Sequence, residues 1–278
     1  MTTEAFPSLD ADAIRETRDA LHAWSRVLGG WLKQSRAKRK HWWHASLRPS
    51  IGGLCTGVVR GDVDFDVELD LVSSRLRVRT SEREAVEELT GQSARSLAAW
   101  LDGTLTDAGV DASLAPADDL RSDAGYPGYD AVEARRLHGA ISSVAAGLEN
   151  LRAGVREETS PIQLWPHHFD LSMIWLPGSK VPGQDPANEE YADKQMNFGF
   201  MFGDEAIPEP YFYVTAYPLP EAMPAVELPA GTTWRSEGFS GAVLLYRDLV
   251  AVDGPAAYLQ DLWSRLLAAG QIHLAGED

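Results

Sequence analysis

A strict alternation of charged and apolar residues over 64–71 is the feature that most constrains the fold of this chain. The segment reads Asp64-Phe65-Asp66-Val67-Glu68-Leu69-Asp70-Leu71, and the alternation returns in Arg75-Leu76-Arg77-Val78-Arg79 after a short turn. A period of two is typical of a strand with one buried face, so the two segments predict an antiparallel hairpin. The carboxylates of the first strand then meet the arginines of the second. This favours a solvated salt-bridge face over a metal-binding stripe.

The remaining patterns predict four helices and several further strands. Apolar residues at helical spacing indicate helices over 14–32, 84–105, 132–155 and 255–269, and Ser81 and Glu84 are spaced as a capping box for the second of these. Strands are expected over 41–47, 162–176, 197–202, 211–217 and 241–246. The strands gather in hairpins and do not alternate regularly with helices. The predicted fold class is therefore α+β, with antiparallel sheet or sheets and helices packed against them.

We expect residues 1–278 to form a single integrated unit. The stretch 107–130 is rich in Asp, Gly, Ala and Pro, so it is the best internal boundary, and it would join halves 1–110 and 130–278 as a linker. Each half shows a helix, a strand with a central histidine, further strands and a closing helix. Aligning 43–47 with 167–171 places His44 over His168, but this match is short enough to arise by chance. Two pseudo-repeated halves are one reading of this pattern.

Composition excludes several classes of function. The 278 residues carry a formal net charge of −16, which argues against sequence-independent binding of nucleic acid. The single cysteine, Cys55, excludes an internal disulfide and a thiolate zinc cage. The chain shows neither a signal peptide nor an apolar run long enough to span a membrane, so we expect a cytoplasmic protein without membrane contact. The oligomeric state is not predicted.

The segment Trp165-Pro166-His167-His168-Phe169-Asp170 is the strongest candidate for a functional site. On an extended strand, His168 and Asp170 would share one face and His167 would point to the other. Burying such polar groups without partners costs about 1–3 kcal/mol, so they are expected to serve as ligands, as catalytic groups or in hydrogen bonds with the protein.

Two functions follow from this segment, and the sequence leaves both open. The first is a small-molecule enzyme, with a divalent metal (Zn, Fe or Mn) on His167, His168 and Asp170 as one form of it. Its catalytic candidates are His44, His168 and Glu190, the last as general base or further ligand. The second is a non-catalytic binding protein whose histidines are satisfied by protein groups. Either function would use an aromatic pocket, for which the candidates are Trp43, Trp165, Trp175 and Tyr191.

The common motifs for cofactor binding and for a catalytic nucleophile do not narrow the choice between these two functions. Neither a phosphate loop nor a dinucleotide pattern nor a nucleophile elbow occurs in the sequence. One basic run extends from Lys33 to Lys40. It is typical of a solvated loop, and the alternative is a local anion site beside Trp42 and Trp43.

Several motifs together resemble one known family. They are His41-Trp42-Trp43-His44 with Ser46-Leu47, Gly91-Gln92-Ser93, 161–165 with Phe169-Asp170-Leu171, and the run from Glu190-Tyr191 through Phe198-Gly199-Phe200 to Pro210-Tyr211-Phe212-Tyr213. In these the chain resembles an uncharacterised bacterial family of unknown function, number five-nine-nine-six in the series of such domains. The resemblance spans nearly the whole chain and implies one integrated unit. It implies no activity, cofactor or catalytic residue.

Overall fold

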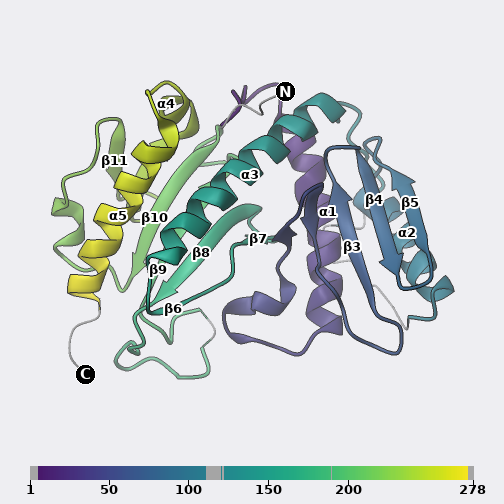
Figure 1. Cartoon of the computed structure of the whole chain (residues 1–278), viewed down its shortest axis with the longest axis horizontal. Coiled ribbons are helices and arrows are strands. Elements are labelled where there is room, and N and C mark those ends of the chain that lie inside the picture. The colour runs from purple at the N-terminus through teal and green to yellow at the C-terminus, as the bar shows by residue number, and fades with distance from the viewer. Residues whose placement is uncertain (1–5, 111–119, 121, 189, 275–278) are drawn as a thin grey trace. The chain divides into compact units, whose positions relative to one another are not determined.

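The computed structural model describes residues 6–110, 120, 122–188 and 190–274. Its elements form two compact units whose segments are interleaved along the chain (Figure 1). Unit 2 comprises Asp12–Ile141 and Gln163–Phe169, and unit 1 comprises Met1–Ala11, Ser142–Ile162 and Asp170–Asp278. The predicted α+β class with antiparallel sheets is confirmed. The pseudo-repeat is not confirmed, and the halves 1–110 and 130–278 stay a prediction.

Unit 2 is built on an antiparallel sheet in the order β1-β2-β3-β4-β5. Helix α1 and helix α2 lie behind this sheet in the view of Figure 1. The strands are β1 (Arg48–Pro49), β2 (Gly53–Cys55), β3 (Phe65–Asp70), β4 (Arg75–Thr80) and β5 (Glu84–Glu88). The other elements of unit 2 are α1 (Arg15–Ser35), the 3-10 segment η1 (Lys40–Ala45), α2 (Ala94–Asp107), the start of α3 (Ala131–Ala153) and β7 (Gln163–Trp165).

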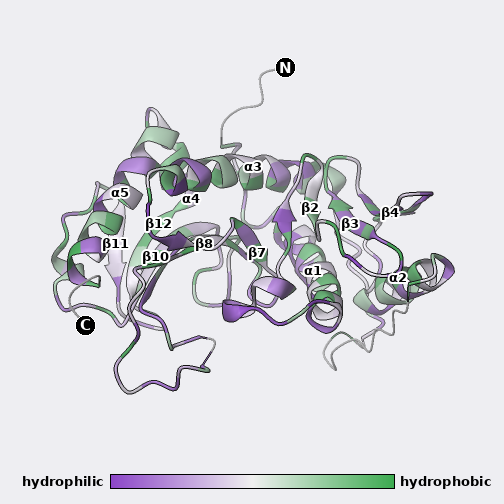
Figure 2. Ribbon diagram, turned by 60° about the horizontal axis from the view of Figure 1, so that its bottom comes forward, coloured by the Kyte–Doolittle hydropathy of each residue, from purple (hydrophilic) through white to green (hydrophobic). Residues whose placement is uncertain are grey.

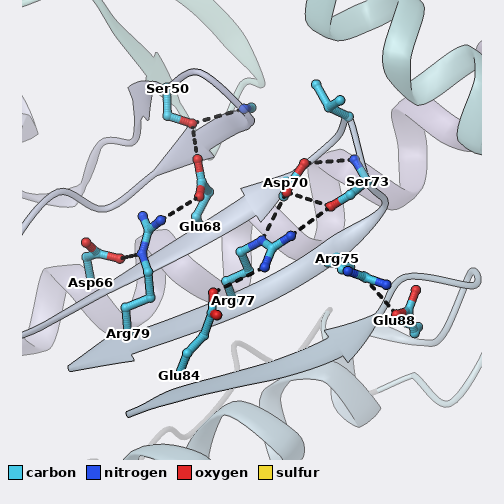
Figure 3. A network of polar contacts seen from close by, with 12 residues as sticks. Ser50, Asp66, Glu68, Asp70, Ser73, Arg75, Arg77, Arg79, Glu84 and Glu88 are labelled. Carbon is cyan, nitrogen blue, oxygen red and sulfur yellow. Dashed lines mark hydrogen bonds and ion pairs between the residues drawn. The ribbon is translucent and has the colours of Figure 1, made fainter. Parts of the chain in front are cut away.

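The predicted hairpin is confirmed as β3 and β4, and its charged face forms a network of ion pairs (Figure 3). Arg79 Nε lies 2.8 Å from Asp66 Oδ1, and Arg77 Nε lies 3.0 Å from Asp70 Oδ2. Burial alone would raise the pKa of Asp70, but hydrogen bonds from Ser73 and Arg77 outweigh it and hold this pKa below its usual value. The alternating carboxylates therefore stabilise the sheet as ion-pair partners.

The helix predicted over 84–105 is wrong in its first part. Glu84–Glu88 forms the edge strand β5, in which Glu84 and Glu88 lie opposite Arg79 and Arg75 of β4. These cross-strand charge pairs favour a strand over the helix that the apolar spacing predicted. Gly91 then adopts φ +90, and α2 begins after Ser93, whose Oγ accepts a hydrogen bond from the N–H of Ser96.

Unit 1 contains an antiparallel sheet in the order β11-β12-β10-β9-β8-β6. Its strands are β6 (Glu158–Thr159), β8 (Asp170–Leu176), β9 (Gln195–Met201), β10 (Tyr211–Tyr217), β11 (Thr232–Arg235) and β12 (Gly241–Leu245). The rest of α3, the turn η3 (Met223–Ala225), α4 (Tyr246–Val250) and α5 (Pro255–His273) complete the unit. The helices predicted over 132–155 and 255–269 are confirmed as α3 and α5, and the strands over 197–202, 211–217 and 241–246 as β9, β10 and β12.

One face of this sheet carries the core of unit 1. Phe198, Phe200 and Phe212 are buried on β9 and β10, and Phe212 meets the ring of Trp263 on α5 edge-on. The side-chain amide of Gln260 on α5 donates to the carbonyl oxygen of Gly147 on α3 at 2.5 Å. Hydrophobic and hydrophilic bands alternate along both helices (Figure 2), as expected for helices with one buried face. Within the described residues, no helix is long and apolar enough to cross a membrane.

Candidate functional site

Helix α1 presents one face that contacts both histidine-bearing segments of unit 2. His22, Gly29 and Lys33 are spaced seven and four residues apart, so they lie along the same side of the helix. His22 contacts the turn 166–169, and Lys33 lies over the indole of Trp42 with Nζ 4.5 Å from the ring centroid. Between them, a Cβ atom at Gly29 would lie 2.7 Å from Pro166 Cγ and 3.1 Å from the carbonyl oxygen of Ala45. Glycine therefore lets both segments approach the helix.

The first of these segments is a turn and not the continuous strand predicted over 162–176. Residues 166–169 connect β7 to β8, and the N–H of Phe169 donates to the carbonyl oxygen of Trp165 at 2.7 Å. Phe169 adopts φ +59, a left-handed conformation that is rare for a bulky residue. The turn sets the rings of His167 and His168 side by side, with centroids 4.2 Å apart. The expectation that they point to opposite faces is wrong, because it assumed an extended backbone.

His22 fixes the turn from the helix side. Its Nε2 donates to the carbonyl oxygen of His167 at 3.3 Å, and its ring stacks on Phe169 with centroids 5.3 Å apart. Burial lowers the pKa of His22, and the hydrogen bond to His167 opposes this shift. Because a carbonyl oxygen can only accept, this contact assigns the proton to Nε2 of His22.

The imidazoles of His167 and His168 belong to exposed residues. The protein atoms packed around His167 and then the positive charges of His168, His22, Arg26 and Lys33 lower the pKa of His167 to about 4. Burial and these neighbours therefore disfavour the protonated form of the His167 imidazole.

The second segment is η1, where a strand was predicted over 41–47. His41 and Trp42 adopt φ +51 and +57, and the N–H of Arg39 donates to Nδ1 of His44 at 3.1 Å. The aromatic rings pair in two stacks, His41 with Trp43 and Trp42 with His44. Ring stacking and the hydrogen bond to His44 hold a turn that two left-handed residues would otherwise oppose. Such strained positions cost about 1–3 kcal/mol each and are common at functional sites.

Two buried contacts join the stretches of chain directly beside these segments, 46–47 after η1 and 163–164 before the turn. Leu47 and Leu164 form a β-bridge, with N–H to O distances of 3.0 and 2.8 Å. The buried hydroxyl of Ser46 lies 2.6 Å from Oε1 of Gln163 and 2.9 Å from the carbonyl oxygen of Trp43. The structure thus brings His44 and Trp43 onto the same part of unit 2 as Trp165, His167 and His168. The expectation that the side chains of His44 and His168 share one pocket stays a prediction.

Helix α1 and the segment η1 lie in a positively charged stretch of an otherwise acidic chain. Residues 20–61 contain no Asp or Glu, and they carry Arg26, Lys33, Arg36, Lys38, Arg39, Lys40, Arg48 and Arg60. The remainder of the chain therefore has a formal charge of −24, which is the total of −16 less these eight positive charges. Lys38 lies over Trp42 at 5.5 Å and Lys40 over Trp43 at 5.4 Å. The basic run 33–40 thus packs on the two indoles.

The other residues predicted for the site belong to unit 1. Asp170 begins β8, and Trp175 is fully buried later in the same strand. Glu190 is exposed on the loop before β9, where its carbonyl oxygen accepts from Nε2 of Gln195 at 2.6 Å. Tyr191 is exposed and packs on Tyr217 with ring centroids 4.9 Å apart. The catalytic role of Glu190 and the pocket roles of Trp175 and Tyr191 stay predictions.

Asp170 has a tyrosine partner that the sequence did not indicate. The Tyr213 hydroxyl donates a short hydrogen bond to Asp170 Oδ2, and the Tyr211 hydroxyl donates to Asp204 Oδ2 at 2.6 Å. Burial and the neighbouring carboxylates raise the pKa of both tyrosines, so both phenols remain protonated donors. Gly199 lies between β8 and β10, and a Cβ atom there would lie 2.3 Å from Cζ of Tyr213. The missing side chain lets Tyr213 reach across β9.

Among the residues that the structure describes, no group of three or more His, Cys, Asp or Glu side chains could hold a metal ion. A metal on His167, His168 and Asp170 therefore stays a prediction. The residues that sequence reasoning missed are His22 and Arg26 on α1. Their helical spacing relative to Gly29 and Lys33 was visible in the sequence, but only the fold shows which segment meets that face.

Unit 2 also contains a cavity of about 440 Å³, and none of its lining residues belongs to the histidine turn 166–169. It is lined by Trp31, Gln34 and Ser35 of α1, by 59–63 with Phe65, and by Gly109 and Val110. The sequence gave no signal for this cavity, because its lining combines ordinary core and loop residues.

Comparison with known families gives one match. A family model described as "Family of unknown function (DUF5996)" matches residues 6–273. Comparisons with curated proteins and with solved structures gave no match.

Proposed function

The chain belongs to this family of unknown function, and from the site itself we propose that unit 2 binds a small molecule. We define the imidazole face as the surface formed by His22, Gly29 and Lys33 of α1 with the turn 166–169 and the segment η1. The observation that carries the proposal is that one helix face holds two remote segments, each with histidines and a left-handed aromatic residue. Exposed imidazoles beside aromatic rings offer hydrogen bonds and apolar contact to one ligand.

The local backbone supports this proposal over a purely structural role. Among the residues that the structure describes, three of the five non-glycine residues with positive φ are His41, Trp42 and Phe169. Strain of this kind persists where the surrounding structure requires it, and it is frequent where ligands are held. A structural role would explain the buried rings of His41, His44 and Phe169, but it gives no reason for two adjacent exposed imidazoles.

The test is a screen of small molecules by NMR, observing the side-chain signals of the histidines and tryptophans. A ligand of the imidazole face is expected to shift the signals of His22 and His167 in a saturable manner. His168→Ala should weaken binding by about tenfold if one hydrogen bond to a charged or polar ligand group is lost. His273→Ala, at the exposed end of α5, is the matched control. Equal affinity of wild type and His168→Ala for every ligand found would contradict the proposal.

The second candidate function is an enzyme that uses the same face. The specific observation in its favour is the pair of adjacent exposed imidazoles, because one ring can position the other for proton transfer. In its metal-dependent form, untagged wild-type protein should contain Zn, Fe or Mn in near-stoichiometric amount, and His168→Ala should lose it. Substoichiometric metal in both proteins, with no thermal stabilisation on adding these metals, would favour binding without a metal.

A further inference from the structure

We propose that the cavity of unit 2 is a second binding site, which takes a neutral, planar small molecule with one polar group. Its volume of about 440 Å³ falls within the roughly 300–1,000 Å³ of typical small-molecule sites. Trp31, which lines the cavity, lies roughly half a turn around α1 from both Gly29 and Lys33. The cavity is therefore on the other side of the helix from the imidazole face, and this inference goes beyond the proposed function.

The buried residues that line the cavity are apolar, and two of them are aromatic. Trp31 of α1 and Phe65 of β3 are 2% and 4% exposed, and their rings meet edge-on with centroids 5.0 Å apart. Val59 is the third buried lining residue. We call these three residues the floor of the cavity. A planar apolar ring system would bury its surface against them, so the floor indicates the shape and polarity of the ligand body.

The exposed lining residues supply the polar groups at the mouth of the cavity. The side-chain amide of Gln34 can donate and accept, and Ser35 Oγ, which donates to the carbonyl oxygen of Trp31 at 3.0 Å, can still accept. Arg60 already forms an ion pair with Asp64, so it does not require an anionic ligand. A charged ligand would lose hydration against the apolar floor, which costs free energy. These groups therefore favour a neutral ligand whose single polar group reaches the mouth.

The loop 60–64 forms one wall of the cavity, and the protein itself holds this loop. The N–H of Val59 donates to the carbonyl oxygen of Phe65 at 2.7 Å, and the N–H of Phe65 donates back at 3.1 Å. These two hydrogen bonds close the base of the loop. The ion pair of Arg60 with Asp64 joins its two ends nearer the tip. The wall is thus in place before a ligand binds.

The end of α2 forms another wall, and a Schellman motif fixes it. The N–H of Val110 donates to the carbonyl oxygen of Leu105 and the N–H of Gly109 donates to that of Thr106, both at 2.9 Å. Gly109 adopts φ +82, the left-handed conformation that this motif needs. A Cβ atom at Gly109 would lie 3.8 Å from Cγ2 of Val63, so the two walls meet at one edge. Binding to walls fixed in this way loses little free energy to ordering of the protein.

The experiment is titration of the full chain with 2-naphthol, a neutral compound of two fused rings with one hydroxyl group. The readout is the indole N–H signal of Trp31 in ¹H–¹⁵N spectra, identified by its absence in Trp31→Phe, and we expect a saturable shift. Val63→Trp places a large side chain at the cavity wall and should weaken binding by about tenfold or more. Val72→Trp is the matched control, because Val72 is 39% exposed and does not line the cavity, and it should leave affinity unchanged.

Two further arms test the chemistry of the ligand. Gln34→Met removes the amide at the mouth but keeps a side chain of similar length, and should weaken binding of 2-naphthol by about two- to tenfold. The compounds 2-naphthoate and 2-naphthylmethylammonium carry the same rings with a negative and a positive charge. Each of them should bind more weakly than 2-naphthol, because the charged group loses hydration.

Four results would overturn the inference. The first is the lack of a saturable shift of the Trp31 signal, including the case in which 2-naphthol shifts only the signals of His22 and His167 on the imidazole face. The second is unchanged affinity in Val63→Trp, and the third is an equal loss in Val72→Trp, which would indicate a general effect on unit 2. The fourth is tighter binding of either charged compound than of 2-naphthol. If Val63→Trp does not fold, Gln34→Trp at the mouth of the cavity serves, with the same expected direction.

Discussion

Gly29 and Pro166 approach so closely that a Cβ atom on the glycine would lie 2.7 Å from Cγ of the proline ring. The contact joins residues that are far apart in the sequence and sets the turn 166–169 against α1. At the adjacent Gly30, a Cβ atom would have no neighbour within 4 Å apart from the backbone of its own helix and the adjoining residues. One helix therefore contains a glycine that packing requires and a glycine that it does not.

Gly29→Ala should lower stability and displace the histidine turn, because neither the proline ring nor the carbonyl group of Ala45 can move away freely. We expect a loss of about 1–3 kcal/mol in the free energy of unfolding, measured by urea denaturation. Gly30→Ala should instead gain about 0.5–1 kcal/mol, since alanine is the better helix former. A similar effect of both substitutions would show that the close approach to Pro166 does not constrain the helix.

Asp70→Asn should destabilise unit 2 at neutral pH and have little effect in acid. The carboxylate accepts hydrogen bonds from Ser73 and Arg77, and its pKa is held below the usual value. A depressed pKa gives stability that is present above the unfolded value of about 3.9 and is lost as pH falls through the folded value.

We expect the variant to lose about 1–3 kcal/mol at pH 7, with the difference from wild type shrinking below about pH 4. Urea denaturation at a series of pH values measures it. Glu88→Gln removes the exposed pair with Arg75 and should cost at most about 1 kcal/mol. A difference between wild type and Asp70→Asn that does not change with pH would exclude this carboxylate as the cause.

Tyr213→Phe should destabilise unit 1, because it removes the hydroxyl that donates to the buried carboxylate of Asp170. The expected loss is about 1–3 kcal/mol in the free energy of unfolding. Tyr191→Phe is the control, since Tyr191 is exposed and its ring contact with Tyr217 needs no hydroxyl. Gly199→Ala should be at least as damaging as Tyr213→Phe, because its methyl group would overlap the Tyr213 ring. Wild-type stability of Tyr213→Phe would mean that Asp170 is satisfied without the phenol.

Ser93→Ala should destabilise α2 by about 1 kcal/mol, because its Oγ accepts the N–H of Ser96 at the first turn. Ser81→Ala should have almost no effect, although Ser81 is the residue that the sequence pattern marks as a cap. Thermal unfolding of the two variants distinguishes the positions. A larger loss in Ser81→Ala would support a helix that starts before Glu84.

The elements that the sequence predicted well are those in which each face keeps the same environment, buried or exposed, along its whole length. The hairpin β3 and β4 has one apolar and one charged face along its whole length, and α1 buries Leu21, Trp24 and Leu28 at helical spacing. In such elements the period of the hydrophobic pattern alone identifies the secondary structure. Besides the start of the helix predicted over 84–105, the predictions failed over 41–47 and in the middle of 162–176, where the chain is apolar and aromatic without a clear period. Left-handed residues turn the backbone there, and sequence spacing does not reveal them.

The sequence alone determined the α+β class and the antiparallel hairpin, because alternation and helical spacing are local properties of the chain. Only the tertiary structure decided which groups meet. Residues 163–169 pack against α1 and η1, so the histidine turn faces Lys33 and Arg26, and Asp170 pairs with Tyr213. These partners are separated by tens of residues, and their contact depends on Gly29, Gly199 and the bridge of Leu47 with Leu164. Packing at those three points cannot be read from the residues on either side of them.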